Sequence, residues 1–338
     1  MKIRFFDPAK GYASIKSEID SAIQDVLARG DLILRKDVEI FEKNFAEYIG
    51  TKYCITCANG TDAIYLALKA CGTKQGDEVV VPAYTFKSTI GAIVNAGATP
   101  ILIDMDGKWN HTISSKTRIF MPVHIAGEVM ETTAIKFWEG ESFGLWRQIE
   151  DACQAVGAIK NPTSLAQCWS FYPAKSLGCY GDAGAITTND EKVYEYVKEA
   201  RNHFKGTNKE FGVNSRMDNL QAAILNVKFK HLPEYIARRE AIANMYYDGL
   251  RGVELPNKQE GRVYQDFIVR TPKRDALYDF LKEQGIETLK NEYPFPPEYP
   301  KPPLTAKYEA ETLRLPCNET LTNEEVQYVI EKINSFFS

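Results

Sequence analysis

The sequence lacks any long apolar segment. Of its 338 residues, 44% are hydrophobic and 25% are charged, yet no apolar run approaches the roughly 18 residues that a membrane-spanning helix needs. The first twenty residues, MKIRFFDPAKGYASIKSEID, contain no apolar core followed by a small-residue cleavage site, as a secretory signal would. We therefore expect a cytoplasmic protein that does not bind a membrane.

Positive charge is neither in excess nor clustered. The chain has 41 basic and 45 acidic residues, a formal net charge of −4 and a calculated isoelectric point near 5.8. Its lysines and arginines are spread along the whole length. This balance argues against nucleic acid as a partner.

The cysteines show no metal-binding or disulfide pattern. There are seven, an odd number with scattered spacing, at positions 54, 57, 71, 153, 168, 179 and 317. Such spacing is typical of free thiols in a reducing compartment. Cys54 and Cys57 form a C-x-x-C, but no second pair or nearby histidines follow at metal-ligand spacing. We expect two buried strand thiols and no metal site.

The order of the elements predicts an α/β fold. In the first 190 residues, strand patterns such as GDEVVVPAY, TPILIDMD and LAQCWSFYPAK (165–175) alternate with helical patterns such as STIGAIVNAG. This alternation indicates a mainly parallel sheet. The remainder is mostly helical, and the chain is too long for one ordinary core. We predict a large domain at 1–235 and a small α/β domain at 236–338, joined by a long helix around 217–250.

The first of three chemically suggestive segments is NGTDA, residues 59–63. It reads as a glycine-containing turn that opens directly into a helix. The free N–H groups and the dipole at such a helix N-terminus favour an anion, most often a phosphate. The alternative is an ordinary helix cap made by Asn59 or Thr61.

The second segment is EDACQA, residues 150–155. It places Asp151 at the carboxyl end of a predicted strand, which is the edge where ligands bind in parallel sheets. A carboxylate there, with Gln154 beside it, can pair with a protonated ring nitrogen. The alternative is that Asp151 is the N-cap of a following helix.

The third segment is SFYPAKSLG, residues 170–178, with Lys175 among aromatic residues and glycines. A buried amine has a lowered pKa and becomes a nucleophile toward carbonyl carbons. The alternative is a lysine that extends to the surface. Taken together, an anion-binding turn, a carboxylate and a nucleophilic lysine are the parts that bind pyridoxal phosphate.

These segments also resemble those of a known family. The chain is similar to the DegT/DnrJ/EryC1/StrS sugar aminotransferases over nearly its whole length. The similarity is carried by FEKNFAEYIG, GTDAIYLAL, GDEVVVPAYTF, EDACQAVGA, SFYPAKSLGCYGDAG and GVNSRMDNLQAAIL. It implies the α/β fold of the fold type I aminotransferases: a large domain with a mainly parallel seven-stranded sheet between helices, and a smaller C-terminal α/β domain.

The resemblance implies a role for each site residue. Lys175 corresponds to the lysine that carries pyridoxal 5'-phosphate, Asp151 to the acid on its ring nitrogen, and Gln154 to the side chain at its 3-hydroxyl. The other expected contacts are Gly60, Thr61 and Ser170 at the phosphate, Phe86 on one ring face and Cys153 on the other. Asn214 corresponds to an asparagine that reaches the phosphate of the neighbouring subunit, which implies a homodimer with shared active sites.

The implied reaction is transfer of an amino group from L-glutamate to a keto nucleotide-sugar. Asp62, directly after the GT pair, favours members that act on C3, hence a 3-keto-6-deoxyhexose. A 4-keto sugar and a non-catalytic sugar-sensing regulator on the same fold remain as alternatives. Related dehydratases carry histidine in place of Lys175, which argues against that activity.

The chain departs from the family pattern at positions that bear on substrate contacts. Arg35 stands where glycine is common, Ala126 where tyrosine is common, and Gln265 and Glu292 where histidine is frequent. Three segments, near 106–117, 158–168 and 291–312, are shortened. The identity of the sugar and of the nucleotide therefore stays open.

Overall fold

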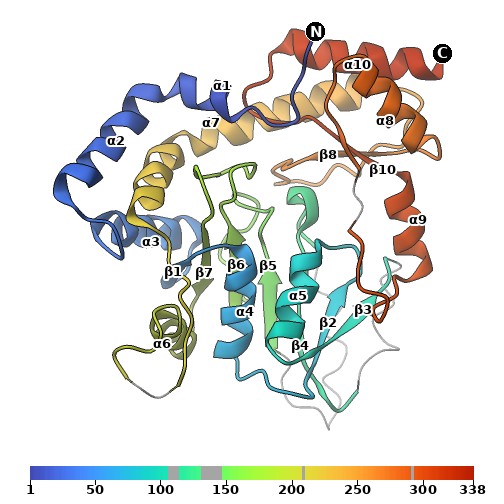
Figure 1. The fold of residues 1–338 in the computed structure, drawn as a ribbon. Coiled ribbons are helices and arrows are strands. Elements are labelled where there is room, and N and C mark those ends of the chain that lie inside the picture. Colours follow the sequence, from blue (N-terminus) through green and yellow to red (C-terminus); the bar gives the residue numbers. More distant parts are fainter. Residues whose placement is uncertain (106–113, 131–146, 208–209, 291–292) are drawn as a thin grey trace.

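The structure is a computed structural model that describes residues 1–105, 114–130, 147–207, 210–290 and 293–338. Its larger part is built on one seven-stranded sheet with the order β1-β7-β6-β5-β4-β2-β3 (Figure 1). The strands are β1 (Tyr53–Cys57), β2 (Glu78–Pro82), β3 (Thr99–Ile103), β4 (Thr117–Phe120), β5 (Arg147–Asp151), β6 (Ala166–Ser170) and β7 (Gly184–Thr188).

The sheet is mainly parallel, as predicted. The pairs β2–β3, β2–β4, β4–β5 and β5–β6 are parallel, whereas β7 runs antiparallel to both of its neighbours, β1 and β6. Among the described strands, β7 alone is reversed, so the other six end at the same edge. Ligands of open α/β sheets bind at this edge.

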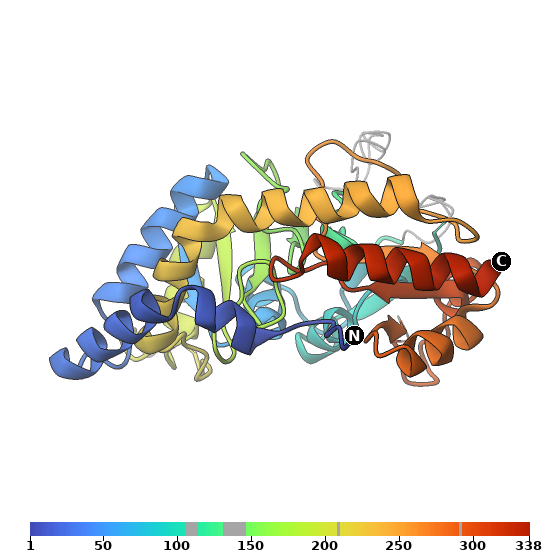
Figure 2. The same cartoon turned by 90° about the horizontal axis from the view of Figure 1, so that it is seen from above.

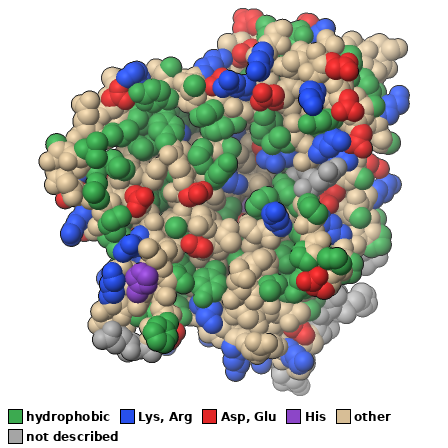
Figure 3. Space-filling view, in the orientation of Figure 1, with side chains coloured by type: hydrophobic (Ala, Val, Ile, Leu, Met, Phe, Trp, Pro, Cys, Tyr) green, Lys and Arg blue, Asp and Glu red, His purple; other side chains and the backbone are tan. Residues whose placement is uncertain are grey.

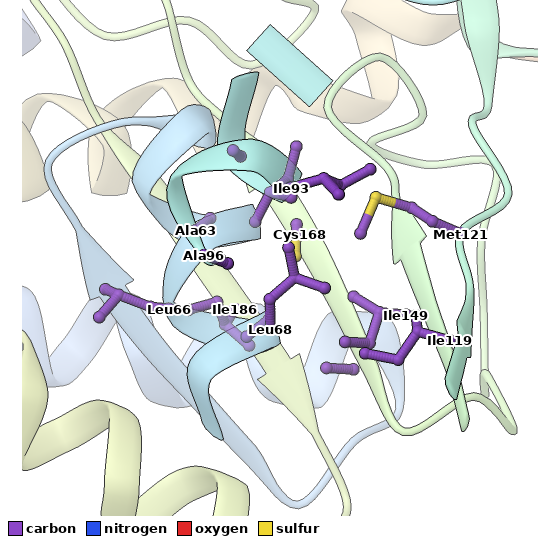
Figure 4. Close-up of a cluster of buried hydrophobic side chains, with 14 of the residues drawn as sticks. Ala63, Leu66, Leu68, Ile93, Ala96, Ile119, Met121, Ile149, Cys168 and Ile186 are labelled. Carbon is purple, nitrogen blue, oxygen red and sulfur yellow. The ribbon is translucent and has the colours of Figure 1, made fainter. Parts of the chain in front are cut away.

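Helices cover both faces of the sheet. They are α3 (Lys36–Ile49), α4 (Gly60–Ala70), α5 (Lys87–Asn95), α6 (Glu191–Ala200) and α7 (Asn219–Gly249). The first two helices, α1 (Pro8–Ser14) and α2 (Lys16–Arg29), lie outside this layer, and α2 packs on α7. Side chains of α4, α5 and α6 pack on one face, where Ile93, Ile149 and Ile186 belong to a single buried cluster (Figure 4). On the other face, α3 and α7 pack over Trp169 of β6. The two faces thus have separate apolar cores.

Helix α3 shows how the sequence pattern produces this packing. Its buried residues Val38, Phe41, Phe45 and Ile49 recur every three or four positions and so form one apolar face. The helix ends at Gly50, which has the left-handed φ of 84° that glycine adopts without a steric penalty. The predicted helix and its glycine stop are confirmed.

The C-terminal part has its own small sheet. This sheet has the antiparallel order β8-β10-β9. Its elements are β8 (Phe267–Arg270), α8 (Arg274–Glu283), β9 (Leu289–Lys290), α9 (Pro303–Glu311), β10 (Thr312–Leu315) and α10 (Asn323–Phe337). Seen from above, the 31-residue helix α7 extends over both parts of the molecule and lies beside α10 (Figure 2).

The predicted domain boundary between residues 235 and 236 falls inside α7 and remains a prediction. The N-terminal residues also reach the C-terminal part, because Ile3 forms a β-bridge with Ile286 and is buried in the C-terminal apolar cluster.

One predicted strand is too long. The pattern LAQCWSFYPAK predicted extended chain through Lys175, but β6 ends at Ser170. Beyond it the Lys175 N–H donates to the Tyr172 carbonyl at 2.8 Å, which closes a turn around Pro173. Proline is favoured in turns because its φ is fixed and it has no N–H for a sheet ladder. Lys175 therefore projects from a turn.

Cys54 and Cys57 are both buried free thiols, as expected. Cys54 packs into the cluster under α3 and Cys57 into the cluster under α4, on opposite faces of the sheet. In the described ranges, no group of three or more metal-ligating side chains could hold an ion, and no helix is long and apolar enough to cross a membrane.

The start of α3 depends on a side chain from α7, which gives a stability prediction. The buried Asn219 accepts hydrogen bonds from the N–H groups of Asp37 (3.1 Å) and Val38 (3.2 Å), and its amide donates to the Asp37 carboxylate at 2.8 Å. Asn219→Ala should lower the free energy of unfolding by about 1–3 kcal/mol, because the Asp37 N–H loses its acceptor. Urea denaturation measures this change.

Asn226→Ala is the matched control. Asn226 also lies on α7, and its amide makes a single 2.9 Å hydrogen bond to the Asp37 carbonyl. Its removal should cost clearly less. Equal losses in the two variants would contradict the proposed cap.

Candidate active site

A cavity of about 630 Å³ lies between the carboxyl ends of the sheet strands and the C-terminal part. Its wall contains nearly all the residues that the motifs single out, from four separate stretches of the chain: Gly60, Thr61, Phe86, Asp151, Cys153, Gln154, Ser170 and Lys175. Asn214 is exposed and lies outside the wall of this cavity. The structure thus brings together every predicted residue of one subunit's site.

One end of the cavity is the N-terminus of α4. The helix begins at Gly60, and Asn59 caps it by accepting the Asp62 N–H at 2.8 Å. A Cβ atom at position 60 would lie only 2.8 Å from both Cys153 Sγ and the Ser170 Cβ atom. Glycine is therefore required for this close approach. The expected cap by Asn59 is therefore present, and Asn59, Gly60 and Thr61 line the cavity at the N-terminus of the helix, where unpaired backbone amides favour an anion.

Asp151 ends β5 with its side chain buried. Its Oδ2 accepts a hydrogen bond from Thr89 Oγ1 at 2.7 Å, and the Thr85 hydroxyl lies 2.8 Å from that of Thr89. Its Oδ1 accepts the Cys153 N–H at 3.1 Å. No helix begins after Asp151, since the residues that follow form turns. The alternative that Asp151 is a helix N-cap is therefore wrong.

Thr85 and Thr89 are site residues that the sequence motifs did not predict. Both are fully buried, and they lie one helical turn apart at the start of α5. Hydroxyl residues spaced four apart beside Phe86 were a visible signal. Only the fold, however, shows that they face a carboxylate 62 positions further along the chain.

Gln154 is held by the backbone of the segment after β4. Its Oε1 accepts the Ala126 N–H at 2.7 Å. This bond occupies the oxygen end of the amide and leaves the NH₂ end as the donor for a ligand oxygen. Ala126 is fully buried with φ of 55°, an uncommon left-handed conformation for a residue other than glycine.

Lys175 stands in the tight turn after β6. A Cβ atom at Gly178 would lie 2.2 Å from the Pro173 carbonyl oxygen, so the turn requires glycine there. Removal of the Lys175 amine from water lowers its pKa below the ordinary value, and the nearby Cys153 and Asp266 act in the opposite direction. The alternative of a lysine that extends into solvent does not hold.

The wall opposite the sheet comes from the C-terminal part and carries a charge pair. Arg314 donates to the Asp266 carboxylate, and the Tyr293 ring meets Phe86 edge to face at 5.3 Å. Phe86 itself is 45% exposed. Arg314, Asp266 and Tyr293 could not be predicted as site residues, because nothing in their local sequence pattern points to a cavity more than 80 residues away.

These residues fit pyridoxal phosphate. The cavity combines a helix N-terminus for the phosphate, a buried carboxylate for the ring nitrogen and an exposed aromatic face for the ring. It also contains an amine whose pKa is lowered. The geometry therefore defines an enzyme site for this cofactor.

The four departures from the family pattern are at different places. Gln265 lies in the cavity wall, whereas Ala126 is buried behind Gln154. Arg35 is exposed at the start of α3, outside the wall of this cavity. Glu292 lies outside the described residues.

Known proteins with similar sequences support the interpretation of this cavity as a pyridoxal phosphate site. The model of the DegT/DnrJ/EryC1/StrS aminotransferase family matches residues 13–334. The chain is 37% identical to the dTDP-3-amino-3,6-dideoxy-alpha-D-galactopyranose transaminase of Aneurinibacillus thermoaerophilus, over 99% of both chains. It is 36% identical to the pleiotropic regulatory protein of Geobacillus stearothermophilus, over 100% of this chain and 99% of the relative.

A solved structure shows the same fold. The crystal structure of S. venezuelae DesV in complex with a ketimine intermediate superposes with a TM-score of 0.91 at 32% identity, covering 99% of this chain and 98% of that one. The chain therefore belongs to the DegT/DnrJ/EryC1/StrS aminotransferase family. The predicted fold, the class of enzyme and the cofactor, pyridoxal phosphate, are confirmed.

The environment of Lys175 gives a pH prediction. In cofactor-free protein, acylation of Lys175 should rise with pH around a midpoint below 10.5, because the lowered pKa makes more of the amine neutral at a given pH. Mass spectrometry of labelled peptides measures this midpoint.

Lys160 is the matched control. Burial lowers the pKa of its amine to about 8, but it lies against Tyr48, away from the cavity. Added pyridoxal phosphate should protect Lys175 and leave Lys160 labelled. A Lys175 midpoint at or above 10.5 would contradict the burial of its amine.

Proposed function

We propose that the protein transfers an amino group from L-glutamate to C3 of a keto nucleotide-sugar, and that the favoured substrate is a 3-keto-6-deoxyhexose. We propose further that it is a cytoplasmic homodimer. The observation that carries this proposal is the meeting of Lys175, Asp151 and the N-terminus of α4 around one cavity. The named transaminase from A. thermoaerophilus, similar over the whole chain, supports an amino-sugar product.

Each residue has one task in this proposal. Bound pyridoxal phosphate supplies an electron sink for the carbon that loses its proton. Lys175 holds the cofactor and, once displaced by the amino donor, its Nζ takes the proton from the donor α-carbon as a general base. Asp151 keeps a proton on the ring nitrogen, and Thr89 fixes the direction of its carboxylate through the 2.7 Å bond.

The remaining residues bind the cofactor and fix its orientation. Gly60, Thr61 and Ser170 bind the phosphate at the start of α4, and Gln154 offers its NH₂ to the ring oxygen. Phe86 covers one ring face while Cys153 lies against the other. A lowered pKa suits Lys175 for this work, because a base must be neutral before it can accept a proton.

Choice of C3 rests on the family pattern at Asp62 and on the names of relatives. The Asp62 carboxylate accepts a hydrogen bond from Ser215 Oγ at 2.7 Å. Asp62 thus joins α4 to the segment before α7. The 3-amino sugar in the name of the A. thermoaerophilus enzyme favours the same carbon.

Incubation with L-glutamate and a panel of 3-keto and 4-keto nucleotide-sugars tests the function. Mass spectrometry should detect the amino sugar, with 3-keto substrates preferred by at least about tenfold in kcat/KM. Glutamate alone should bleach the visible absorbance of the bound cofactor. Lys175→Ala, the control, should form no product.

Two other outcomes would assign a different function. Preference for the 4-keto substrates would mean that the enzyme aminates C4 of the sugar and not C3. A protein that keeps its absorbance with glutamate and aminates no sugar would favour the alternative of a non-catalytic, sugar-sensing regulator; the G. stearothermophilus relative is named a pleiotropic regulatory protein.

The homodimer is proposed from the family role of Asn214 and from its position. Asn214 is exposed in the segment before α7, where it forms an isolated β-bridge with Asn202. Hydrophobic side chains gather on the face of the molecule where α2 and the first turns of α7 lie (Figure 3), and Leu27 and Leu32 are among the exposed ones. A second copy would cover such a surface and bring Asn214 to the partner's phosphate site.

Mixed dimers test the sharing of sites. Combining a Lys175→Ala subunit with an Asn214→Ala subunit places both defects in one site and none in the other, if Asn214 acts across the interface. Activity should then recover to about half of wild type. Should mixed dimers form without recovery, while Asn214→Ala alone is impaired, Asn214 acts within its own chain.

A further inference from the structure

One side chain of the C-terminal part holds the turn that carries Lys175. Gln265 lies just before β8 and is 6% exposed. Its Oε1 accepts hydrogen bonds from the Ser176 N–H at 2.8 Å and from Ser176 Oγ at 3.0 Å. Its Nε2 donates to the Ala174 carbonyl at 2.9 Å. The two residues that it binds flank Lys175 directly.

The backbone of Gln265 is fixed from behind by a buried arginine. Arg239, on α7, is 2% exposed, and its Nη1 donates to the Gln265 carbonyl at 3.0 Å and to the Cys317 carbonyl at 2.6 Å. Its Nη2 forms a 2.8 Å ion pair with Glu319. A buried charge with these partners resists displacement, since each broken bond would leave a desolvated polar group.

The connection therefore runs from α7 through Gln265 to both sides of Lys175. The large part contributes the turn itself, and the C-terminal part contributes the amide that grips it. A lysine side chain has four rotatable bonds, so the direction of its amine depends on where its backbone is held. A misplacement of about 1 Å in a reacting group can cost on the order of a hundredfold in rate.

We propose that Gln265 is a positioning residue that aligns Lys175 and makes this alignment depend on the placement of the C-terminal domain. The proposal rests on the proposed function of Lys175. It differs from the substrate contact that the family pattern suggests at position 265, because both ends of the Gln265 amide bind the Lys175 turn. Gln265 therefore positions Lys175 and does not bind the substrate.

Gln265→Leu removes the three hydrogen bonds with little change in volume. In the holoenzyme, kcat should fall about tenfold to a hundredfold, while KM for the sugar and Kd for pyridoxal phosphate stay within about threefold. The second readout needs neither cofactor nor sugar: the acylation midpoint of Lys175 in cofactor-free protein should move, because its amine leaves its fixed surroundings.

Gln265→His provides a pH readout that a merely structural role would not move. A neutral imidazole can accept from the Ser176 N–H with one nitrogen and donate to the Ala174 carbonyl with the other, so kcat should be largely rescued above pH 7. Protonation of the imidazole removes the nitrogen lone pair that accepts the Ser176 N–H. Since an imidazole titrates near 6.5 and burial lowers that value, kcat of this variant should fall below about pH 6 more steeply than wild type.

Phe267→Leu is the matched control. Phe267 lies two residues further along, is fully buried and packs in the C-terminal core against Tyr246. It should lower the melting temperature without shifting the Lys175 midpoint or the kcat pH profile.

Three outcomes would overturn the proposal: a rise in the sugar KM of Gln265→Leu with kcat unchanged, equal effects of Gln265→Leu and Phe267→Leu, or an unshifted Lys175 midpoint in Gln265→Leu. Failure of the proposed function itself would appear separately, as wild-type protein that binds pyridoxal phosphate without aminating any sugar.

Discussion

Burial of charged groups is the constraint on which the active-site end of this molecule depends. Lys175, Asp151, Asp266 and Arg314 all line one cavity. Each charge removed from water costs several kcal/mol unless a partner compensates. Asp151 has the Thr89 hydroxyl and the Cys153 N–H, and Asp266 has Arg314. Burial lowers the pKa of the Lys175 amine, and the nearby Cys153 and Asp266 offset only part of this effect.

The sheet topology explains why such groups can meet at all. Six of the seven strands end at one edge, and the turns that follow β1, β2, β5 and β6 bring their polar residues to it. The reversed strand β7 passes under this edge. A Cβ atom at its first residue, Gly184, would lie 2.4 Å from the carbonyl carbon of Asn59. The start of α4, where the phosphate is expected to bind, therefore requires glycine at position 184.

Much of this arrangement could be predicted from the sequence because its signals are local. Asp151 and Gln154 lie three residues apart, Gly60 opens its own helix, and Lys175 stands within a short aromatic and glycine-rich stretch. The pattern of α3 likewise fixes a helix with a glycine end. The alternation of strands and helices was enough for the fold class.

The parts that could not be predicted are contacts between distant segments. Thr89 meets Asp151 across 62 positions, and Gln265 meets Ser176 across 89. No periodicity or spacing encodes such pairs. The end of β6 at Ser170 was also missed, because the apolar run continues through Phe171 into the turn. Gln265 looked like a substrate contact for the same reason: the sequence shows the residue type and not its neighbour.

Helix α7 mechanically couples the large sheet to the C-terminal part. Its first residue, Asn219, is anchored against α3, and its far end packs in the C-terminal core. Pro233 lies within the helix and has no N–H to donate, so one hydrogen bond of the helix is missing there and a bend at this point costs less free energy. From Pro233 to Gly249 the arm is roughly 24 Å long at 1.5 Å per residue, and a bend of about 5° moves its tip by roughly 2 Å. A small change of angle at Pro233 would thus displace the far end of α7 by about an atomic diameter.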